Sequence, residues 1–227
     1  MIIDFLPVSL NDYPGKIATT VFTAGCNFKC PYCHNAELIK YSNKNIDKDF
    51  FQYIESRKNL IKAVCITGGE PTLHSELQDF CKKCNQMNLS VKLDTNGTNP
   101  KVLEELINNN LIDYVAMDIK TDYKDYCKFG ANDKDIQNIK KSINLLKTSN
   151  IDYEFRITVH PKLLNSKQAK EIAKEIFPVK KLVLQAYKYS DGVLDKDFCG
   201  KTSCPPDYLE QIKKAMNEYI ENISLRV

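Results

Sequence analysis

Residues 26–33 read Cys26-Asn27-Phe28-Lys29-Cys30-Pro31-Tyr32-Cys33. Three thiols therefore stand four and three residues apart in one short loop, close enough along the chain to point at one centre. A structural zinc site is closed by four protein ligands. A 4Fe–4S cluster held by three cysteines instead leaves one iron open to a small molecule. The count and spacing favour the iron–sulfur cluster.

Two other interpretations of these thiols stay open. His34 could complete a zinc site as the fourth ligand, although it directly follows Cys33 and a fourth ligand usually comes from a second knuckle. The thiols could also be core residues, because Cys often packs as a small hydrophobe. Three cysteines within eight residues, with Pro31 between them and Gly25 beside them, are an unusual pattern for a core.

The composition is that of an ordinary globular protein. The chain has 227 residues, of which 43% are hydrophobic and 27% charged, and we expect one domain, with a core at about 16–187 and a C-terminal loop and helix at 188–227. The net charge of +3 is too balanced to indicate a nucleic-acid partner. No signal peptide or membrane-length apolar run is visible. We expect a cytoplasmic location, where closely spaced cysteines bind metal or do redox work.

Strand-like and helix-like segments alternate along the sequence. Apolar, β-branched runs predict six strands, at residues 17–23, 63–67, 89–94, 114–119, 152–159 and 181–186. Helical periodicity predicts helices at 47–58, 74–87, 101–109, 133–149, 166–177 and 207–221, with Ser166 as an N-cap. This order predicts an α/β fold with parallel strands, of the partial (β/α)6 TIM-like barrel kind. A flat doubly wound sheet is the competing arrangement.

Polar and glycine-rich segments follow these strands. They are the cysteine loop, Gly68-Gly69-Glu70-Pro71, Asp94-Thr95-Asn96-Gly97, Asp118 with Lys120, and Arg156 with His160. In barrels of this kind the site lies at the carboxyl ends of the strands. One rim is therefore expected to collect all of the candidate residues.

The order of these motifs resembles a known superfamily. A Cys-x-x-x-Cys-x-x-Cys motif after the first strand, followed by Gly-Gly-Glu-Pro after the second, resembles the motifs of the radical S-adenosylmethionine (SAM) enzymes. The resemblance implies a fold of the radical SAM type. Residues 12–16 and 22–35 resemble more narrowly the activating proteins of anaerobic ribonucleoside-triphosphate reductases, a branch of the glycyl-radical enzyme activases. The resemblance covers most of the chain, to about Gln185.

The resemblance implies roles for the first two motifs. It makes Cys26, Cys30 and Cys33 the ligands of a 4Fe–4S cluster whose open iron binds the methionine part of SAM. Tyr32 would lie near the adenine. Gly68 and Gly69 would let the backbone approach the methionine end. Glu70 would accept a hydrogen bond from the SAM ammonium group.

The resemblance also implies roles for three later strand ends. Asp94, Thr95 and Asn96 would contact the ribose and a monovalent cation, and Asp118 would be a second carboxylate beside that cation. Lys120 would meet the SAM carboxylate, unless it is a solvated residue at a strand end.

Two residues are interpreted from their surroundings in the sequence. Arg156 lies inside an apolar strand, so we expect a carboxylate or the cofactor as its partner. His160 could stack on the adenine or cap a loop.

The remaining cysteines are assigned weaker roles. Cys81 and Cys84 lie three apart on an apolar helix face, which favours core packing over a metal site. Cys199 and Cys204 are too few for an auxiliary cluster unless Cys127 and another cysteine join them. A redox-active pair or a loop facing a partner is the alternative.

The resemblance implies an enzyme with no catalytic side chain beyond the cluster and SAM. A flavodoxin or ferredoxin would supply one electron, SAM would be cleaved reductively to a 5′-deoxyadenosyl radical, and that radical would take a hydrogen from a glycine of the reductase. The partner could instead be a pyruvate formate-lyase-like glycyl-radical enzyme. Two rivals are a small-molecule radical SAM enzyme, such as a 7-carboxy-7-deazaguanine synthase-like protein, and a metal-stabilised binding module without catalysis. Neither nucleic acid nor membrane is expected as a partner.

Overall fold

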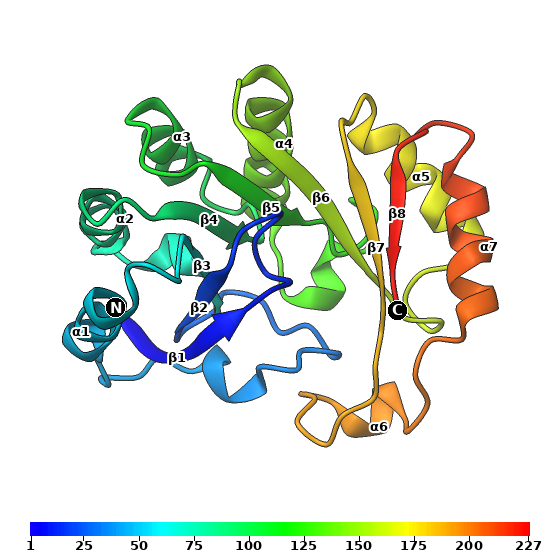
Figure 1. Cartoon of the computed structure of the whole chain (residues 1–227). Helices are drawn as coiled ribbons and strands as arrows, with labels where there is room; N and C mark the ends of the chain where they lie inside the picture. The colour runs from blue at the N-terminus through cyan, green and yellow to red at the C-terminus, as the bar shows by residue number, and fades with distance from the viewer. The chain divides into compact units, whose positions relative to one another are not determined.

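The computed structural model describes residues 1–227 as alternating strands and helices (Figure 1). The chain forms two compact units. The first comprises Met1–Cys26, Glu37–Thr95 and Asn99–Ala116, and the second comprises Asn27–Ala36, Asn96–Thr98 and Met117–Val227. Strand β5 (Tyr114–Asp118) contributes residues to both units. The expected single domain therefore stays a prediction.

The first unit is built on a sheet of β1 (Ile2–Ser9), β2 (Ala18–Thr23), β3 (Ala63–Gly68) and β4 (Ser90–Thr95). β2, β3 and β4 pair in parallel, and β1 pairs with β2 in the antiparallel sense. The connections carry α1 (Asp47–Arg57), α2 (Leu77–Gln86) and α3 (Pro100–Asn108), with short 3-10 turns η1 (Ala36–Ile39) and η2 (Pro71–Leu73). Parallel strands require such helical crossovers.

The second unit continues the alternation. Strands β6 (Asp152–Val159), β7 (Leu182–Ala186) and β8 (Ile223–Arg226) pair in parallel. Its helices are α4 (Asp133–Thr148), α5 (Ser166–Ile176), α6 (Lys196–Cys199) and α7 (Pro206–Met216), with the turn η3 (Tyr126–Phe129). In α4, Ile139, Ile143 and Leu146 are buried, which is the apolar face expected from the helical spacing.

All six predicted strands and six predicted helices are present, within a few residues of their expected ends. β1 and β8 were not predicted. The N-cap of α5 is Asn165 rather than Ser166, because the Asn165 side chain and Gln168 form a reciprocal capping box. Cys81 and Cys84 are fully buried in α2, which confirms the core interpretation.

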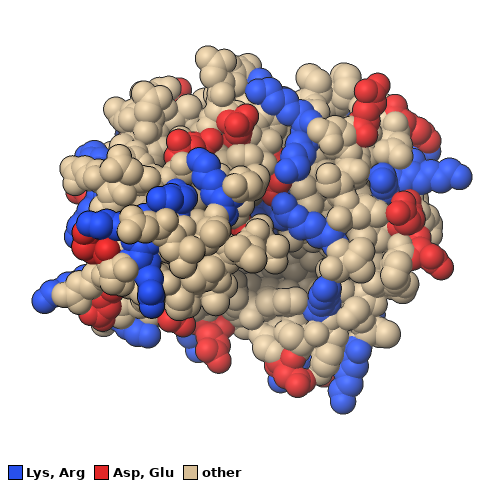
Figure 2. All heavy atoms as spheres, in the orientation of Figure 1, with Lys and Arg blue, Asp and Glu red and all other residues tan.

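Charged side chains of both signs are interspersed on the face drawn in Figure 2. This agrees with 32 basic and 29 acidic residues in the whole chain. No helix is both long enough and apolar enough to span a bilayer.

Candidate active site

The cysteine loop begins directly after the buried strand β2. At its start, the Gly25 N–H donates to the Leu38 carbonyl at 2.7 Å and the Cys26 N–H donates to the Ile39 carbonyl at 3.1 Å. Gly25 has a φ of 92°, and a Cβ there would lie 2.5 Å from the Tyr41 ring. Only glycine therefore fits the turn that leads into Cys26.

The rest of the loop belongs to the second unit and bonds within it. The Lys29 N–H donates to the Phe129 carbonyl at 2.9 Å, and the Asp195 N–H donates to the Pro31 carbonyl at 3.0 Å. A tight turn is closed by the Cys33 N–H, which donates to the Cys30 carbonyl at 2.9 Å. The backbone from Lys29 to Cys33 is thus fixed by bonds with two other segments of the chain.

The three motif cysteines form no disulfide, and Cys30 is buried while the other two are half-buried. Burial raises the pKa of the Cys33 thiol, while the Asn35 backbone and the Lys120 ammonium group oppose this effect. No three His, Cys, Asp or Glu side chains are grouped in a way that would hold a metal ion. The assignment of Cys26, Cys30 and Cys33 as ligands therefore rests on the motif and stays a prediction.

Tyr32, which lies between Cys30 and Cys33 in the sequence, is buried. Its ring packs edge-on against that of Phe129, with ring centroids 6.0 Å apart. Its hydroxyl is buried and has no hydrogen-bond partner in the chain. Burial raises the pKa of Tyr32 well above its ordinary value. An unpartnered buried hydroxyl is costly, and a ligand bound beside the loop could satisfy it.

The Gly68-Gly69 turn packs on the backbone that leads to the cysteines. The Gly69 N–H donates to the Thr23 carbonyl and the Glu70 N–H to the Gly25 carbonyl, each at 2.8 Å. A Cβ on Gly69 would lie 2.1 Å from the Gly25 oxygen, and one on Gly68 would lie 2.5 Å from the Thr23 backbone. The missing side chains thus let this turn approach the first loop of the chain itself.

Glu70 is 1% exposed and bonds within the chain. Its Oε1 atom accepts hydrogen bonds from the Thr72 N–H at 3.2 Å, the Thr72 hydroxyl at 2.6 Å and the Thr95 hydroxyl at 2.7 Å. This carboxylate therefore joins the ends of β3 and β4. Its predicted contact with the SAM ammonium group is untested.

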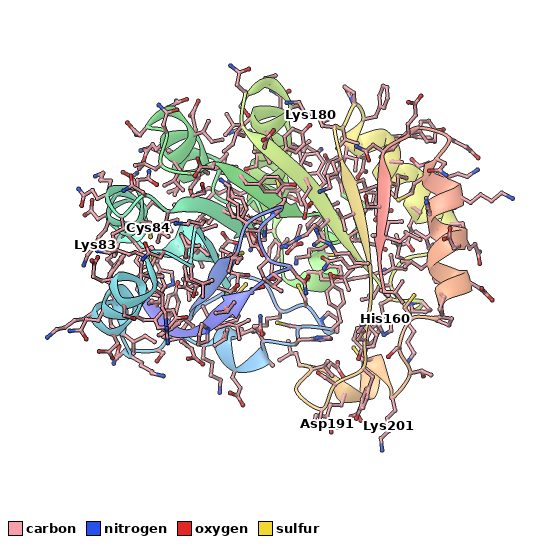
Figure 3. The ribbon with its side chains drawn as sticks, in the orientation of Figure 1. Lys83, Cys84, His160, Lys180, Asp191 and Lys201 are labelled. Atoms are coloured by element: carbon pink, nitrogen blue, oxygen red, sulfur yellow. The ribbon has the colours of Figure 1, made fainter.

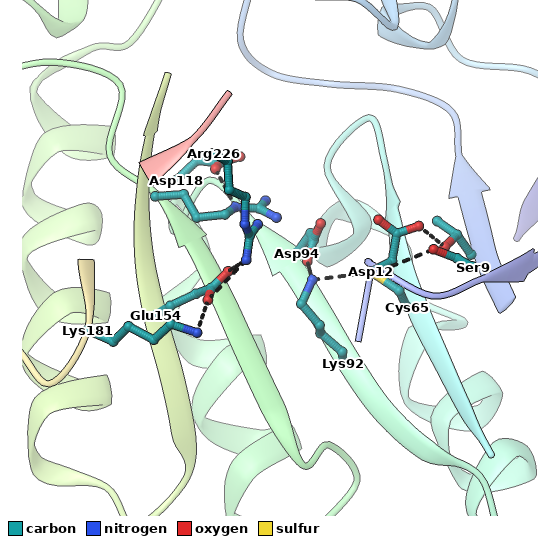
Figure 4. Close-up of polar contacts among 11 residues, drawn as sticks. Ser9, Asp12, Cys65, Lys92, Asp94, Asp118, Glu154, Lys181 and Arg226 are labelled. Atoms are coloured by element: carbon teal, nitrogen blue, oxygen red, sulfur yellow. Dashed lines mark hydrogen bonds and ion pairs between the residues drawn. The ribbon is translucent and has the colours of Figure 1, made fainter. Parts of the chain in front are cut away.

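Asp94 forms an ion pair with Lys92, and the Lys92 Nζ atom also lies 3.4 Å from the Cys65 sulfur (Figure 4). The sequence pattern did not identify Lys92. A signal was present, because Lys92 and Asp94 alternate with Val91 and Leu93 and so share the polar side of β4.

The Asn96 side chain forms a hydrogen bond with the cysteine loop. Its Nδ2 donates to the Asn27 Oδ1 at 2.8 Å, and the Asn27 Nδ2 donates to the Thr98 hydroxyl at 2.9 Å. The Asn96 Oδ1 accepts from the Thr98 N–H at 3.0 Å and from its hydroxyl at 2.7 Å. We call Asn27, Asn96 and Thr98 the amide clamp. Asn27 and Thr98 were missed because this contact joins distant residues.

Asp118 is bound by two cations. The Lys120 Nζ lies 3.1 Å from one carboxylate oxygen, and the Arg156 Nε lies 2.9 Å from the other. Burial opposes ionisation of Asp118, but Arg156 and Lys120 hold the pKa of that carboxyl well below its usual range. Arg156 thus has the carboxylate partner that its place in an apolar strand predicted, and Lys120 is not a solvated strand end.

His160 is buried at the end of β6, near the segment that carries α6 (Figure 3). Its Nδ1 accepts the Lys162 N–H at 3.2 Å, so it caps the following turn. Its ring lies 4.6 Å from that of Tyr187 and 5.8 Å from that of Phe198. Burial lowers the pKa of His160. The capping alternative is present in the structure, and stacking on the adenine is untested.

Two comparisons decide the family. Residues 20–176 match the model of the radical SAM superfamily. The chain is also 34% identical over 225 residues to a Methanocaldococcus jannaschii protein provisionally named a glycyl-radical enzyme activating enzyme, covering 96% of this chain and 92% of that protein.

The chain is a radical SAM enzyme of the glycyl-radical enzyme activating family.

Two further comparisons place this activase among known proteins. It is 26% identical to the pyruvate formate-lyase-activating enzyme of Clostridium pasteurianum, over 94% of this chain and 95% of that enzyme. The structure of Streptococcus suis SuiB bound to S-adenosylmethionine superposes with a TM-score of 0.70 at 16% identity, covering 90% of this chain and 49% of SuiB. This structural neighbour confirms the predicted α/β fold of the partial (β/α) barrel kind.

Membership of the superfamily implies a 4Fe–4S cluster and SAM as cofactors. The residues of the activase fit these groups. Three thiols lie on a backbone fixed by hydrogen bonds, and a buried tyrosine hydroxyl beside them lacks a partner.

The implied monovalent cation fits less well. Both carboxylates expected to hold it, Asp94 and Asp118, already form ion pairs with cations of the chain.

Proposed function

We propose that this activase installs a glycyl radical on an anaerobic ribonucleoside-triphosphate reductase. The observation that carries the proposal is the Cys26–Cys30–Cys33 loop, with its backbone fixed by hydrogen bonds, in a chain that aligns almost end to end with an activase relative. Residues 12–16 and 22–35, which resemble the reductase activators, support the choice of partner.

Cys26, Cys30 and Cys33 would hold the cluster. When bound, the cluster and SAM supply the one-electron cleavage that makes a 5′-deoxyadenosyl radical. The chain's own residues would bind and orient these two groups. Lys120 and Arg156 place two positive charges around one carboxylate, and this excess suits the carboxylate of SAM. Tyr32 offers its hydroxyl beside the same loop.

The remaining roles follow from the same proposal. Asp94, Thr95 and Asn96 would contact the ribose of SAM. Glu70, Gly68 and Gly69 would lie at its methionine end. Asp118 would hold Lys120 and Arg156 in place. A flavodoxin or ferredoxin in the cytoplasm would supply the electron.

The test is an anaerobic assay in two steps. The cluster is reconstituted, and the reduced enzyme is incubated with SAM, with 5′-deoxyadenosine as the product measured. The enzyme is then mixed with the anaerobic reductase, and a glycyl radical is sought by electron paramagnetic resonance. Cys30→Ala should abolish both signals. Cys127→Ala, which removes an exposed thiol outside the motif, should leave both unchanged.

The outcomes separate the rival functions. Failure of the wild-type enzyme to cleave SAM would contradict the enzymatic proposal. Cleavage without a radical on the reductase would reject that partner. A radical on a pyruvate formate-lyase-like enzyme would then favour the second activase, and saturable binding of a pterin-like compound would favour a small-molecule enzyme.

A further inference from the structure

The side chain of Lys92 on β4 places a buried ammonium group beside the sheet of the first unit. Its side chain is only 4% exposed, and its strand neighbours Val91 and Leu93 are fully buried. Lysine is almost never buried this deeply unless it is paired. The partners of this side chain therefore explain why it is tolerated.

Asp94 is the charged partner. It lies two residues after Lys92 on β4, so both side chains emerge on the same face of the strand. The Lys92 Nζ donates to the Asp94 Oδ1 atom and to the sulfur of Cys65 at 3.4 Å. Cys65 stands directly opposite Lys92 in the parallel ladder of β3 and β4. Strand register thus fixes the ammonium group beside this carboxylate (Figure 4).

A free cation at Asp94 would have to approach this ammonium group. A free cation would gain less from a carboxylate that already carries a tethered ammonium group, and that group would repel it at close range. The ammonium is tethered to the strand, so it stays at Asp94 without the cost of capturing an ion from solution. Asp118 likewise forms ion pairs with side chains of the chain itself, those of Lys120 and Arg156.

We propose that Lys92 is a built-in counterion that positions Asp94 for SAM, and that the enzyme therefore needs no free monovalent cation. The proposal rests on the proposed function, because Asp94 is taken there as a SAM contact. Lys92 is a positioning residue, since it acts through Asp94 and not on the reacting atoms.

The experiment compares potassium chloride with tetramethylammonium chloride at equal ionic strength. Tetramethylammonium is too large to replace a bare alkali cation at a carboxylate. Two quantities are measured: the Kd for SAM of the unreduced, cluster-loaded enzyme by equilibrium dialysis, and the Tm of the cluster-free protein. Neither readout depends on turnover, so a failure of SAM cleavage, which would contradict the proposed function, is seen separately.

The variants are Lys92→Met, which removes the charge and keeps the stem, and Lys92→Arg, which keeps the charge. Wild type and Lys92→Arg should give the same Kd and Tm in both salts. Lys92→Met should bind SAM roughly tenfold more weakly or worse in tetramethylammonium, and potassium should restore part of the affinity and raise its Tm. Lys82→Met breaks an exposed pair with Asp79 and is the matched control. It should show no salt-specific change.

Two results would overturn the proposal. One is a potassium requirement for SAM binding in the wild-type enzyme. The other is a Lys92→Met variant whose Kd is unchanged or does not respond to potassium. If Lys92→Met does not fold, the wild-type comparison decides alone, because potassium independence supports the built-in counterion and dependence rejects it.

Discussion

Gly69 shows how a single missing side chain positions the cysteine loop. Its φ lies outside the left-handed region, so alanine could adopt the backbone conformation, but the added Cβ would stand 2.1 Å from the Gly25 oxygen. We expect Gly69→Ala to destabilise the protein by about 1–3 kcal/mol or more, because overpacking forces the backbone apart. The same shift should lower the iron retained after reconstitution. Urea denaturation and iron analysis measure the two effects.

Gly192→Ala is the matched control for this variant. Its backbone is also outside the left-handed region, but the nearest atom to an added Cβ lies 3.6 Å away. It should unfold like wild type and retain full iron. Equal behaviour of the two variants would show that the Gly69 contact does not hold the loop.

Glu175 gives a pH-dependent prediction at the same scale. Its carboxylate accepts the Tyr123 N–H, and burial raises the pKa of Glu175 from an ordinary 4.5 to about 7, with the charge of Asp122 adding to the effect. Because the folded-state pKa is raised, this group stabilises the fold fully below pH 4.5, and its contribution is lost as the pH rises through about 7.

Glu175→Gln, which resembles the protonated form, should therefore match wild type near pH 4.5 and be more stable at pH 8. After allowance for partial solvent screening, we expect a gain of about 1–2 kcal/mol. Urea denaturation of the cluster-free proteins at both pH values measures it. Glu171→Gln, at an exposed carboxylate paired with Lys174, should show no gain. A Glu175→Gln difference that does not vary with pH would contradict the prediction.

At the scale of elements, the amide clamp joins the turn after β4 to the cysteine loop. Asn96 is 5% exposed and bonds to both Asn27 and Thr98. Asn96→Ala would leave the Thr98 N–H without that acceptor, at a cost of about 1–3 kcal/mol. We also expect faster loss of iron, because Asn27 lies between two motif cysteines.

Iron release to a chelator, followed by visible absorption, tests the clamp. Asn144→Ala, on the exposed side of α4, is the control and should release iron like wild type. If Asn96→Ala retains iron as long as the control does, the clamp has no role in holding the loop.

The elements also show what the sequence could reveal. β2, β3, β5 and β7 are mostly apolar or β-branched runs, a pattern that burial on both faces produces. In β4 and β6, buried apolar residues alternate with polar ones. Both patterns made the six central strands predictable. β1 contains Asp4 and Pro7 and is largely exposed, which hides its strand pattern. β8 has only four residues and alternates Ile223 and Leu225 with polar side chains. Neither gives a long periodic signal.

The site was predictable where a motif is local. Gly-Gly-Glu-Pro and the cysteine loop lie within a few residues each, and the structure brings them together through Gly69 and Gly25. Lys92 and Asn27 were not predictable in this way. The contacts of Lys92 with Cys65 and of Asn27 with Asn96 depend on which residue of one segment stands opposite which residue of another, and sequence periodicity does not encode that register. Only the pairing of Lys92 with Asp94 was signalled, by their alternation along β4.

At the scale of the whole chain, the superfamily model ends at residue 176, yet the alternation of strands and helices continues through β7, α7 and β8. β8, the last strand of the second unit, is joined to β6 by the side chain of Arg226. The Arg226 guanidinium lies 3.1 Å from the carboxylate of Glu154 on β6, a residue with a side chain that is 0% exposed, and Lys181 binds the same carboxylate at 2.8 Å (Figure 4).

Arg226→Met should therefore destabilise the protein by about 1.5–3 kcal/mol, because a buried carboxylate loses one of its charged hydrogen-bond donors. Replacing Glu154 by Gln as well should recover part of this loss, since no buried charge then remains to be compensated. Urea denaturation of both single variants and the double variant forms a double-mutant cycle. Arg57→Met, at the exposed end of α1, should have little effect. Strictly additive losses in the cycle would show that β8 is not anchored through Glu154, and its parallel pairing with β7 would then be what keeps the segment beyond residue 176 in the fold.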